Sequence, residues 1–352
     1  MKINREEFAG VIQRVAGQIK TRSTIPILSC VRIQAINGGF KAQASDLDTF
    51  IEASCCCDGE LEACCVAPGP LLALSSYGPD TMELSMNETR LKVVSGAMAT
   101  LSVASAEEFP PWPDGGKDLV VNASDLADGI NAVKWAADPR SEQGIMRKSI
   151  GVDLVTKANK IAVFACDGKE LGCYSKPAIV PNAKFVALSE SVGPLCEAMK
   201  GTNPTIKLDD NWIVVSSEGF RCAIGLVEGE FPNLKPITDM ESEYMCELPI
   251  EATIEALTAM KSFSNVDEHV FAQCSANGKG LEFEFVGKTS DFRAVVDCVL
   301  SNKPKAPVRY DAVRLHDVLK NMPGEMVKFS LNDTQMRFES GDLLAILAQV
   351  KG

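Results

Sequence analysis

Five cysteines within eleven residues are the feature of the sequence that most suggests chemistry. They form two groups, Cys55, Cys56, Cys57 and Cys64, Cys65. Closely spaced thiols can bind a metal or act as a redox switch, but consecutive residues of an extended chain point to opposite faces. The spacing matches no zinc pattern, and the chain has only two histidines, His269 and His316. We therefore predict no metal site and interpret these cysteines as reduced, small apolar residues in two strands joined by Asp58-Gly59.

Carboxylates and the remaining polar residues form no catalytic constellation. Asp46 and Asp48 would share one face of a strand, as an acid–base pair does, but their position at a strand end favours turn formation. His316 is expected on a helix with Arg314 and Lys320, where a lone histidine is usually a surface residue. The sequence has no P-loop, glycine-rich dinucleotide fingerprint or nucleophile elbow. We predict no catalytic residues, no cofactor and no enzymatic activity.

The segments that would position these residues repeat along the chain. Glu108-Phe109-Pro110 recurs as Glu230-Phe231-Pro232, 122 residues later, and the prolines indicate a sheet edge or strand end. One hairpin sequence has three similar copies, at 87–96, 209–213 and 332–341. This period is too long for a solenoid and predicts three similar α+β domains. Their expected bounds are 1–117, 118–240 and 241–352.

Apolar periodicity predicts two helices and several antiparallel strands in each module. Helices are expected over 5–19, from Pro68, from Ser124-Asp125, over 183–199 and from Ile250. Asn37-Gly38-Gly39 predicts a hairpin turn between the strands on either side.

Composition indicates an ordinary protein of the cell interior. The 352 residues are 46% apolar and 23% charged, and they are enough for two or three domains. No apolar run approaches membrane-spanning length, and the start of the chain lacks the apolar core of a signal peptide, so we expect a cytoplasmic protein. The net charge of −12 argues against a generally basic nucleic-acid binder but is compatible with a local basic lining.

Several segments resemble the bacterial DNA polymerase III β sliding clamp family. They occur in the family's order and spacing and cover essentially the full chain. The segments are Arg22-Ser23-Thr24-Ile25-Pro26-Ile27-Leu28-Ser29, Ser45-Asp46-Leu47-Asp48, Val66-Ala67-Pro68, 101–113, Asp167-Gly168, Ile179-Val180-Pro181, 228–232, Ser264-Asn265 and the terminal hairpin.

The resemblance implies a processivity factor for DNA replication. Three repeated DNA-clamp domains, each with two helices packed on antiparallel sheets, would form a protomer of a head-to-tail homodimer. The dimer would close into a ring around double-stranded DNA without reading its sequence. The implied partners are the DNA polymerase III alpha subunit, the clamp loader delta subunit and other proteins with a clamp-binding motif, with no membrane involved.

The resemblance also implies that helices with a sparse set of cations line the ring. Arg22 is the strongest candidate because it matches a family arginine that contacts DNA. The candidate DNA-binding residues are Arg5, Arg14, Lys20, Arg22, Lys134, Arg140, Arg147, Lys148, Lys184, Lys200, Arg314 and Lys320.

A pocket for a partner peptide is implied between the second and third modules. Lys169 and Glu170 stand where the family has histidine and arginine, so an unpaired Glu170 would favour a basic ligand. The residues that map to the pocket are Ser149, Cys166, Gly168, Lys169, Glu170, Leu171, Pro232, Pro236, Ile237, Ile346, Leu347, Ala348, Gln349 and Val350.

The ring interface implied by the resemblance places Phe109 of one protomer against Ser262 and Phe263 of the next. Alternatively, Phe109 belongs to its own domain core, as Phe231 could. Two other functions also remain open at this stage: a cysteine-rich metal or redox protein on a clamp scaffold, and a peptide-binding module that does not encircle DNA.

Overall fold

The computed structural model describes residues 1–19, 24–87, 89–113, 115–263, 271–277, 279–287, 290–302, 304 and 306–350. The chain divides into two compact units, each built from two stretches of sequence. The first unit contains Met1–Ala127 and Ser191–Leu226, and the second contains Asp128–Glu190 and Val227–Gly352. Residues 118–240 contribute to both units. The three-domain boundaries remain a prediction.

The first unit contains two antiparallel sheets. One has the strand order β1-β6-β7-β8, and the other β10-β15-β16-β17-β4-β3-β2-β5-β9. The strands are β1 (Lys2–Asn4), β2 (Val31–Ile36), β3 (Gly39–Ser45), β4 (Thr49–Cys56), β5 (Leu61–Val66), β6 (Thr81–Asn87), β7 (Arg90–Ser95), β8 (Ala97–Ser102), β9 (Ala104–Ser105), β10 (Lys117–Asp118), β15 (Thr205–Leu208), β16 (Trp212–Ser217) and β17 (Phe220–Gly225). The pairing of β17 with β4 joins segments that are far apart in sequence.

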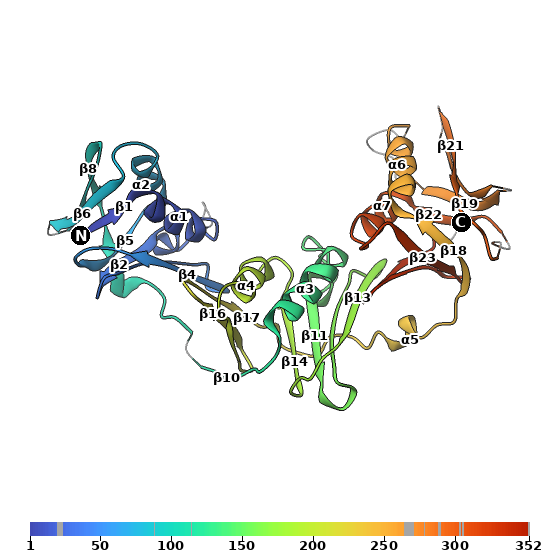
Figure 1. Cartoon of the computed structure of the whole chain (residues 1–352), viewed down its shortest axis with the longest axis horizontal. Helices are drawn as coiled ribbons and strands as arrows, with labels where there is room; N and C mark the ends of the chain where they lie inside the picture. The colour runs from blue at the N-terminus through green and yellow to red at the C-terminus, as the bar shows by residue number, and fades with distance from the viewer. Residues whose placement is uncertain are drawn as a thin grey trace. The chain divides into compact units, whose positions relative to one another are not determined.

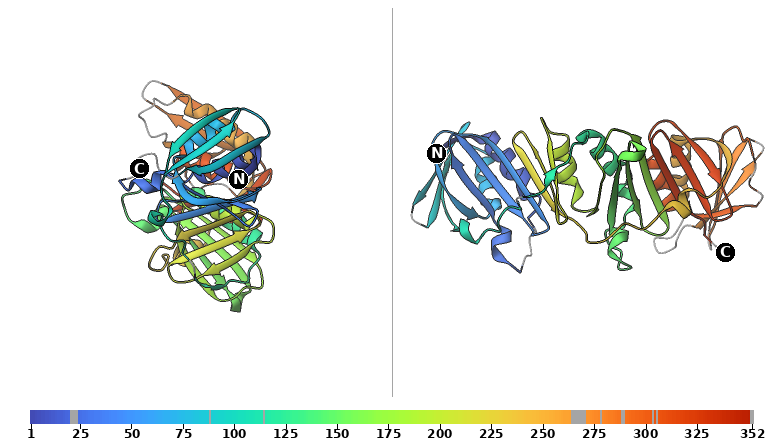
Figure 2. Two further views of the ribbon diagram at one scale, coloured as in Figure 1. Left: turned by 90° about the vertical axis from the view of Figure 1, so that its left-hand side faces the viewer. Right: turned by 90° about the horizontal axis from the view of Figure 1, so that it is seen from below.

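Helices α1 (Arg5–Ala16), α2 (Pro68–Ser75) and α4 (Val192–Met199) pack on these sheets. Asn4 caps α1, because its side-chain oxygen accepts hydrogen bonds from the next two backbone amides after Arg5. Phe8, Ile12 and Val15 of α1 are buried as their spacing predicts, and the ribbon of α1 lies behind the blue strands in the view from below (Figure 2). The α-helix ends at Ala16, before the predicted end at residue 19.

The second unit also contains two antiparallel sheets. Their orders are β14-β11-β12-β13-β25-β24-β23-β18 and β21-β20-β19-β22. The strands are β11 (Ser149–Val155), β12 (Lys160–Cys166), β13 (Glu170–Pro177), β14 (Ala183–Leu188), β18 (Glu243–Pro249), β19 (Phe271–Asn277), β20 (Gly280–Val286), β21 (Asp291–Asp297), β22 (Val308–Asp311), β23 (Met326–Leu331), β24 (Gln335–Ser340) and β25 (Leu343–Ala348).

Helices α6 (Ile250–Lys261) and α7 (Ala312–Lys320) pack against each other in the second unit (Figure 1). The other α-helices are α3 (Ala123–Val133), which crosses the division between the units, and the short α5 (Lys235–Thr238). Single 3₁₀ turns occur at Pro26–Ser29, Ala106–Glu108, Lys134–Ala136, Ile145–Lys148 and Thr156–Ala158. No helix in the described part of the chain is long and apolar enough to cross a membrane.

Two helix predictions need correction. The segment 183–199 begins as strand β14, and only its end forms α4. The backbone of Ala183–Leu188 pairs with β11, and this long-range ladder overrides the local pattern. Helix α3 is capped by Asn122, whose side-chain oxygen accepts a hydrogen bond from the Asp125 amide, so Ser124 lies inside the helix.

Local turn chemistry is predicted correctly in two places. Asn37 and Gly38 have φ of 54° and 77°, as a tight hairpin turn between β2 and β3 requires. The Asp46 carboxylate accepts a hydrogen bond from the Thr49 amide, which confirms a turn-forming role for this residue.

The clustered cysteines lie on strands that are not neighbours. Strands β4 and β5 are separated in the sheet by β3 and β2, so Asp58-Gly59 connects them without forming a hairpin. Cys64 and Cys65 are buried apolar residues as predicted, whereas Cys56 is exposed. All thirteen cysteines are free thiols.

Candidate functional site

Most of the predicted peptide-pocket residues lie around one turn of the second unit. The turn between β12 and β13 contains Gly168, which adopts a φ of 93° that favours glycine. Asp167 fixes this turn, because its carboxylate accepts hydrogen bonds from the amides of Lys169 at 2.8 Å and Glu170 at 2.9 Å. The sulfur of Cys166 accepts a further hydrogen bond from the Gly168 amide.

The end of β25 lies directly beside this turn. Leu171 pairs with Ile346 in the β13–β25 ladder, and the Ala348 amide donates a 2.8 Å hydrogen bond to the carbonyl of Lys169. Leu171 and Ile346 are buried, whereas Ala348 is exposed at the end of the strand. The buried candidates Leu171 and Ile346 therefore lie next to a more exposed end of β25, which Gln349 follows.

The short helix α5 covers the neighbouring strand. Gln335 pairs with Ala348 in the β24–β25 ladder, and its side-chain amide donates to the carbonyl of Ile237 at 3.3 Å. Ile237 is 37% exposed, and Pro232 and Pro236 are exposed as well. Helix α5, the end of β25 and the β12–β13 turn therefore form one surface of the second unit, with apolar side chains available at its rim.

Ser149, another pocket candidate, does not contribute to this surface. Its side chain is fully buried at the start of β11. Its hydroxyl donates a 2.8 Å hydrogen bond to the carbonyl of Ile145, which leaves it a structural role at the end of a 3₁₀ turn.

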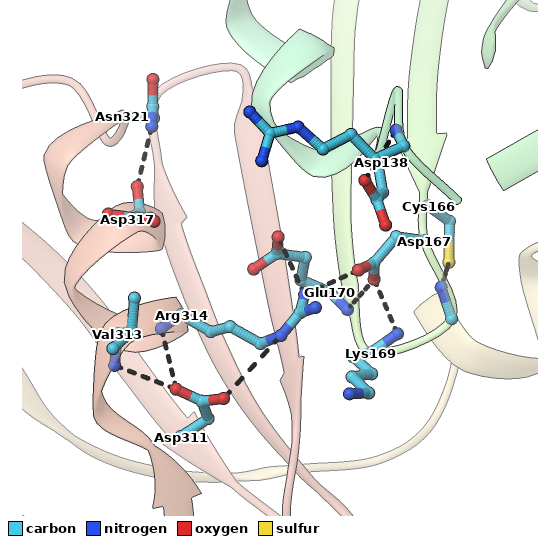
Figure 3. Close-up of polar contacts among 12 residues, drawn as sticks. Asp138, Cys166, Asp167, Lys169, Glu170, Asp311, Val313, Arg314, Asp317 and Asn321 are labelled. Atoms are coloured by element: carbon cyan, nitrogen blue, oxygen red, sulfur yellow. Dashed lines mark hydrogen bonds and ion pairs between the residues drawn. The ribbon is translucent and has the colours of Figure 1, made fainter. Parts of the chain in front are cut away.

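A charged cluster links helix α7 to the β12–β13 turn, and Figure 3 shows Arg314 reaching from α7 toward Glu170 and Asp167. We call Asp167, Glu170, Asp311 and Arg314 the Arg314 cluster. The guanidinium lies 2.6 Å from the Asp167 carboxylate and 3.1 Å from Glu170. Asp311 caps α7 by accepting from the Val313 and Arg314 amides and lies 4.0 Å from the guanidinium. The expectation of an unpaired Glu170 is therefore wrong.

Burial governs the ionisation of Glu170. Its side chain is only 12% exposed, and burial raises its pKa to about 7, opposed by Arg314 and reinforced by Asp167, Asp317 and Asp311. One carboxylate oxygen of Glu170 is buried and has no hydrogen-bond partner within the described residues. The site therefore contains a carboxyl group that can take up a proton near neutral pH.

Sequence reasoning did not select Asp167 and Asp311, although signals for both were present. Asp167 precedes a glycine at a strand end, and Asp311 precedes the apolar periodicity of a helix. Their shared contact with Arg314 had no such signal, because Asp167 lies 147 residues away from it.

Two of the DNA-binding candidates, Arg5 and Arg14, make defined contacts within the first unit. Arg5 donates a 3.0 Å hydrogen bond to the carbonyl of Ser75, and its side chain is only 18% exposed. Arg14 lies 2.6 Å from the Glu197 carboxylate and 4.1 Å above the ring centroid of Phe220. Both cations have defined intramolecular contacts that fix α1 to its neighbours.

The candidates of the α3 region and the helix ends differ in exposure. Lys134, Arg140, Lys200 and Lys320 are exposed, and Lys134 donates a hydrogen bond to Asn131. Arg147 and Lys148 are half-buried, and the Arg147 side chain packs on the backbone of Gly168. The exposed Lys184 faces Asp153 at 3.7 Å. Arg314, another candidate, is half-buried and has three carboxylates within 4.0 Å of its guanidinium. Lys20 and Arg22 lie outside the described residues.

The predicted interface residues lie in different environments. Phe109 is 7% exposed and packs with Ile27, Leu28 and Cys65 in the core of the first unit. Phe263, after the end of α6, is 45% exposed and lies 5.1 Å from the ring of Phe292 on β21. Ser262 is exposed at the C-terminal end of α6. The burial of Phe109 agrees with the alternative that it is a domain-core residue.

Two cavities of the second unit lie mostly outside the predicted pocket set. One, of about 350 Å³, lies between the loop 139–148 and the segment 188–190. The other, of about 570 Å³, lies beside β18 and includes Gln349 with three acidic side chains. Those acidic residues are Glu241, Glu243 and Asp333.

Comparison with known proteins shows what this chain is similar to. Residues 1–113 match the DNA polymerase III beta subunit, N-terminal domain. A beta sliding clamp of Chlamydia muridarum is 22% identical over 94% of this chain and 92% of its own length. One from Treponema pallidum is 24% identical over 75% of this chain and 73% of its own length. These comparisons show a likeness to the bacterial DNA polymerase III β subunit: a family model matches the first 113 residues, and the sequence relatives are beta sliding clamps.

Solved structures match the fold over the entire chain. A DNA polymerase III subunit beta from Pseudomonas aeruginosa has a TM-score of 0.91 at 18% identity, with 100% of both chains covered. The pol III beta of Caulobacter crescentus has a TM-score of 0.89 at 17% identity, with 100% of this chain and 99% of that one covered. The predicted α+β fold of repeated clamp domains is confirmed. The likeness to sliding clamps agrees with the prediction of a non-enzymatic protein and gives no support to the metal, redox or non-encircling alternatives.

Proposed function

We propose that the protein is a sliding clamp that encircles duplex DNA as a head-to-tail homodimer in the cytoplasm. The observation that carries this proposal is the match of the complete chain to clamp structures, with a TM-score of 0.91 and no large part of either chain left over. A ring holds DNA by topology, so it needs few strong contacts with phosphates and none with base edges.

Two exposed strand edges support the proposed dimer. Strand β8 ends the four-stranded sheet of the first unit, and β21 ends that of the second. No other strand of the described residues pairs with the outer side of either edge, so each can accept a further strand. Met98 on β8 is 68% exposed and Val295 on β21 is 39% exposed, which supplies apolar contacts beside the backbone pairing. In our proposal, β8 of one protomer pairs with β21 of the next, and both edges are used because the arrangement is head-to-tail.

The exposed cations support a weak interaction with DNA. Lys134, Arg140 and Lys320 are exposed to solvent, and the net charge of −12 limits nonspecific adhesion. In our proposal, these residues and Lys200, with Lys20 and Arg22, keep the duplex centred while the ring moves along it. Arg5, Arg14 and Arg314 have a smaller part because their charges are already paired.

The surface formed by α5, the end of β25 and the β12–β13 turn is the proposed docking site for partner peptides. Exposed Ile237 and the adjacent prolines can receive apolar side chains, and Ala348 leaves the chain end open. The proposed partners are the DNA polymerase III alpha subunit, the clamp loader delta subunit and other proteins with a clamp-binding motif. The solved sliding clamps from Pseudomonas aeruginosa and Bartonella birtlesii are each bound to griselimycin.

Loading onto circular DNA tests the proposal. The protein, loaded by a clamp loader onto a nicked circle, should remain bound during gel filtration and leave when the circle is cut once. The uncut circle is the control. Equal loss from cut and uncut circles would contradict encirclement, and a solution mass of one chain at micromolar concentration would contradict the dimer.

A further inference from the structure

The first unit contains a second copy of the scaffold that forms the proposed docking surface. Strand β17 pairs with β4 there, as β25 pairs with β13 in the second unit. Asp46 fixes the β3–β4 turn, because its carboxylate accepts a 2.8 Å hydrogen bond from the Thr49 amide. The carbonyl of Asp48 accepts a 2.7 Å hydrogen bond from the amide of Gly225 at the end of β17. The contacts of Asp167 and its neighbours have the same arrangement in the second unit.

The same backbone conformation and spacing recur at the centre of both turns. Leu47 has a φ of 79° and Gly168 one of 93°, and the two residues are 121 positions apart. A leucine at positive φ is unfavourable, so the surrounding contacts impose this turn on the first unit. Beside the turn, the buried Phe50 pairs with Ala223 of β17, as Leu171 pairs with a residue of β25.

The two copies differ in what lies over them. In the second unit, the exposed Ile237 of α5 lies beside β24. In the first unit, the ring of Trp112 lies edge-on to that of Phe50, with 5.8 Å between the ring centroids. The Arg221 guanidinium lies 4.5 Å from the centroid of the Trp112 ring, and the ring of Trp212 on β16 lies 5.6 Å from that of Phe50. We call Phe50, Trp112, Trp212 and Arg221 the Trp112 cluster.

The segment that carries Trp112 has the properties of a docked peptide. Pro110, Pro111 and Pro113 surround Trp112, and residues 110–113 contain no helix or strand. Phe109, which precedes them, has φ of −73° and ψ of 136°, close to the polyproline II conformation. Extended segments rich in proline dock on aromatic surfaces with little loss of conformational entropy.

Only contacts of the ring hold the indole of Trp112 in place. Its Nε1 is buried and has no hydrogen-bond partner within the described residues. A buried N–H without a partner is unfavourable, so the edge-on contact with Phe50 and the stacking on Arg221 must stabilise this position. A peptide side chain that makes the same ring contacts can therefore take the place of Trp112.

We propose that the Trp112 cluster is a second peptide-docking site and that the chain's own segment 110–113 closes it. This inference rests on the proposed function, because the docking surface of the second unit is the basis of the comparison. The ligand class is a short, extended peptide with proline and an aromatic side chain, which is the chemistry of the segment that occupies the site. In the wild type, the covalently attached segment has a high effective concentration at the site, so free peptides compete poorly with it.

Removal of the Trp112 ring tests the proposal. The probe is a synthetic peptide with the sequence of residues 108–113, titrated into the full-length protein and followed by calorimetry. We expect Trp112→Ala to bind one peptide per chain more than the wild type, because the vacated cluster is open to the probe. Trp112→Phe keeps an aromatic ring at the site and should bind this additional peptide at least about tenfold more weakly than Trp112→Ala.

Further variants locate the additional site. Trp112→Ala combined with Trp212→Ala removes a second ring of the cluster and should also bind the additional peptide at least about tenfold more weakly. Trp112→Ser replaces Trp112→Ala if that variant folds poorly, because residue 112 lies outside the helices and strands. An unchanged number of bound peptides after removal of the ring would overturn the proposal, as would equal additional binding by the variant that lacks both rings.

Griselimycin binding to the wild type tests the docking surface of the second unit separately. Its absence would contradict the proposed docking function there, whereas the difference in bound peptide between Trp112→Ala and the wild type reports on the Trp112 cluster alone.

Discussion

Glu170 combines a buried position with a cation from a distant helix. A buried carboxyl is driven toward its neutral form, while a guanidinium at 3.1 Å favours the charged form. Burial is the larger effect, because the pKa of Glu170 is raised to about 7. Arg314 must also balance Asp167 and Asp311, so its charge is divided among three carboxylates. One arginine shared among acids therefore joins α7 to the β12–β13 turn, which is part of the candidate docking site.

The raised pKa makes part of the protein's stability depend on pH. The folded state binds more protons than the unfolded state between the ordinary carboxyl pKa and about pH 7, so Glu170 contributes less stability as pH rises through this window. Glu170→Gln mimics the neutral form. Urea unfolding at about pH 5 and about pH 8 measures the free energy of unfolding of both proteins. The difference between variant and wild type should shift in favour of the variant from pH 5 to pH 8, by up to roughly 3 kcal/mol. Glu142→Gln, at an exposed position, is the control, and an identical trend in both variants would contradict the role of Glu170.

Removal of the shared cation should destabilise the second unit. Arg314→Ala leaves the Asp167 and Glu170 carboxylates without their partner at positions only 5% and 12% exposed, and we expect a loss of about 3 kcal/mol. Lys320→Ala, on the same helix but exposed, should change stability by less than about 0.5 kcal/mol. Denaturant unfolding of both variants at pH 8 measures the difference. Equal, small effects would show that Arg314 is a dispensable surface cation.

The end strands of the sheets differ in whether another segment covers their outer edge. The end strand β18 is covered by the segment after β21 through the hydrogen bond from Ser301 to Met245. Strands β8 and β21 end their sheets with apolar side chains exposed. Natural proteins usually protect such edges with charge or irregularity. The contrast supports the proposal that β8 and β21 are the edges used in assembly.

A charge on β8 should weaken assembly. Met98→Lys places a cation at the proposed strand edge, where burial by a second protomer would desolvate it. Light scattering across a dilution series should show the dimer dissociating at a protein concentration at least about tenfold higher than for wild type. The matched control is Met326→Lys, at another exposed methionine on β23 inside a sheet. Unchanged dissociation of Met98→Lys would contradict pairing through β8.

The whole molecule is acidic, and its candidate DNA-facing cations are few. A small number of phosphate contacts releases few counterions, so retention on DNA in the proposed function depends on closure of the ring. Several candidates are already paired within the protein, as Arg14 is with Glu197. This arrangement suits a protein that moves along DNA, since each strong phosphate contact would resist movement.

Salt should therefore separate topological retention from electrostatic binding. The half-life of the loaded protein on a nicked circle should change by less than about threefold between roughly 50 and 200 mM salt, whereas a complex held by six to ten phosphate contacts would weaken by about 10³ or more. Gel filtration at each salt concentration measures the bound fraction. A loss approaching the larger value on uncut circles would mean that the protein is held by charge.

The sequence by itself determined the features that depend on neighbouring residues and on repetition. Asn37-Gly38 specified a turn, Asp46 indicated a strand end, and the recurrence of Glu-Phe-Pro and of one hairpin indicated repeated α+β domains. The order of the motifs indicated the likeness to sliding clamps. These features can be recognised in the sequence because turn geometry and strand alternation require particular residues at fixed local spacing.

Only the tertiary structure decided which distant residues share an environment. It paired Glu170 with Arg314, placed Phe109 in the core of its own unit, and turned residues 183–188 into a strand by pairing them with β11. Burial, ion pairing and strand pairing depend on the positions of atoms far apart in sequence, so local patterns do not encode them.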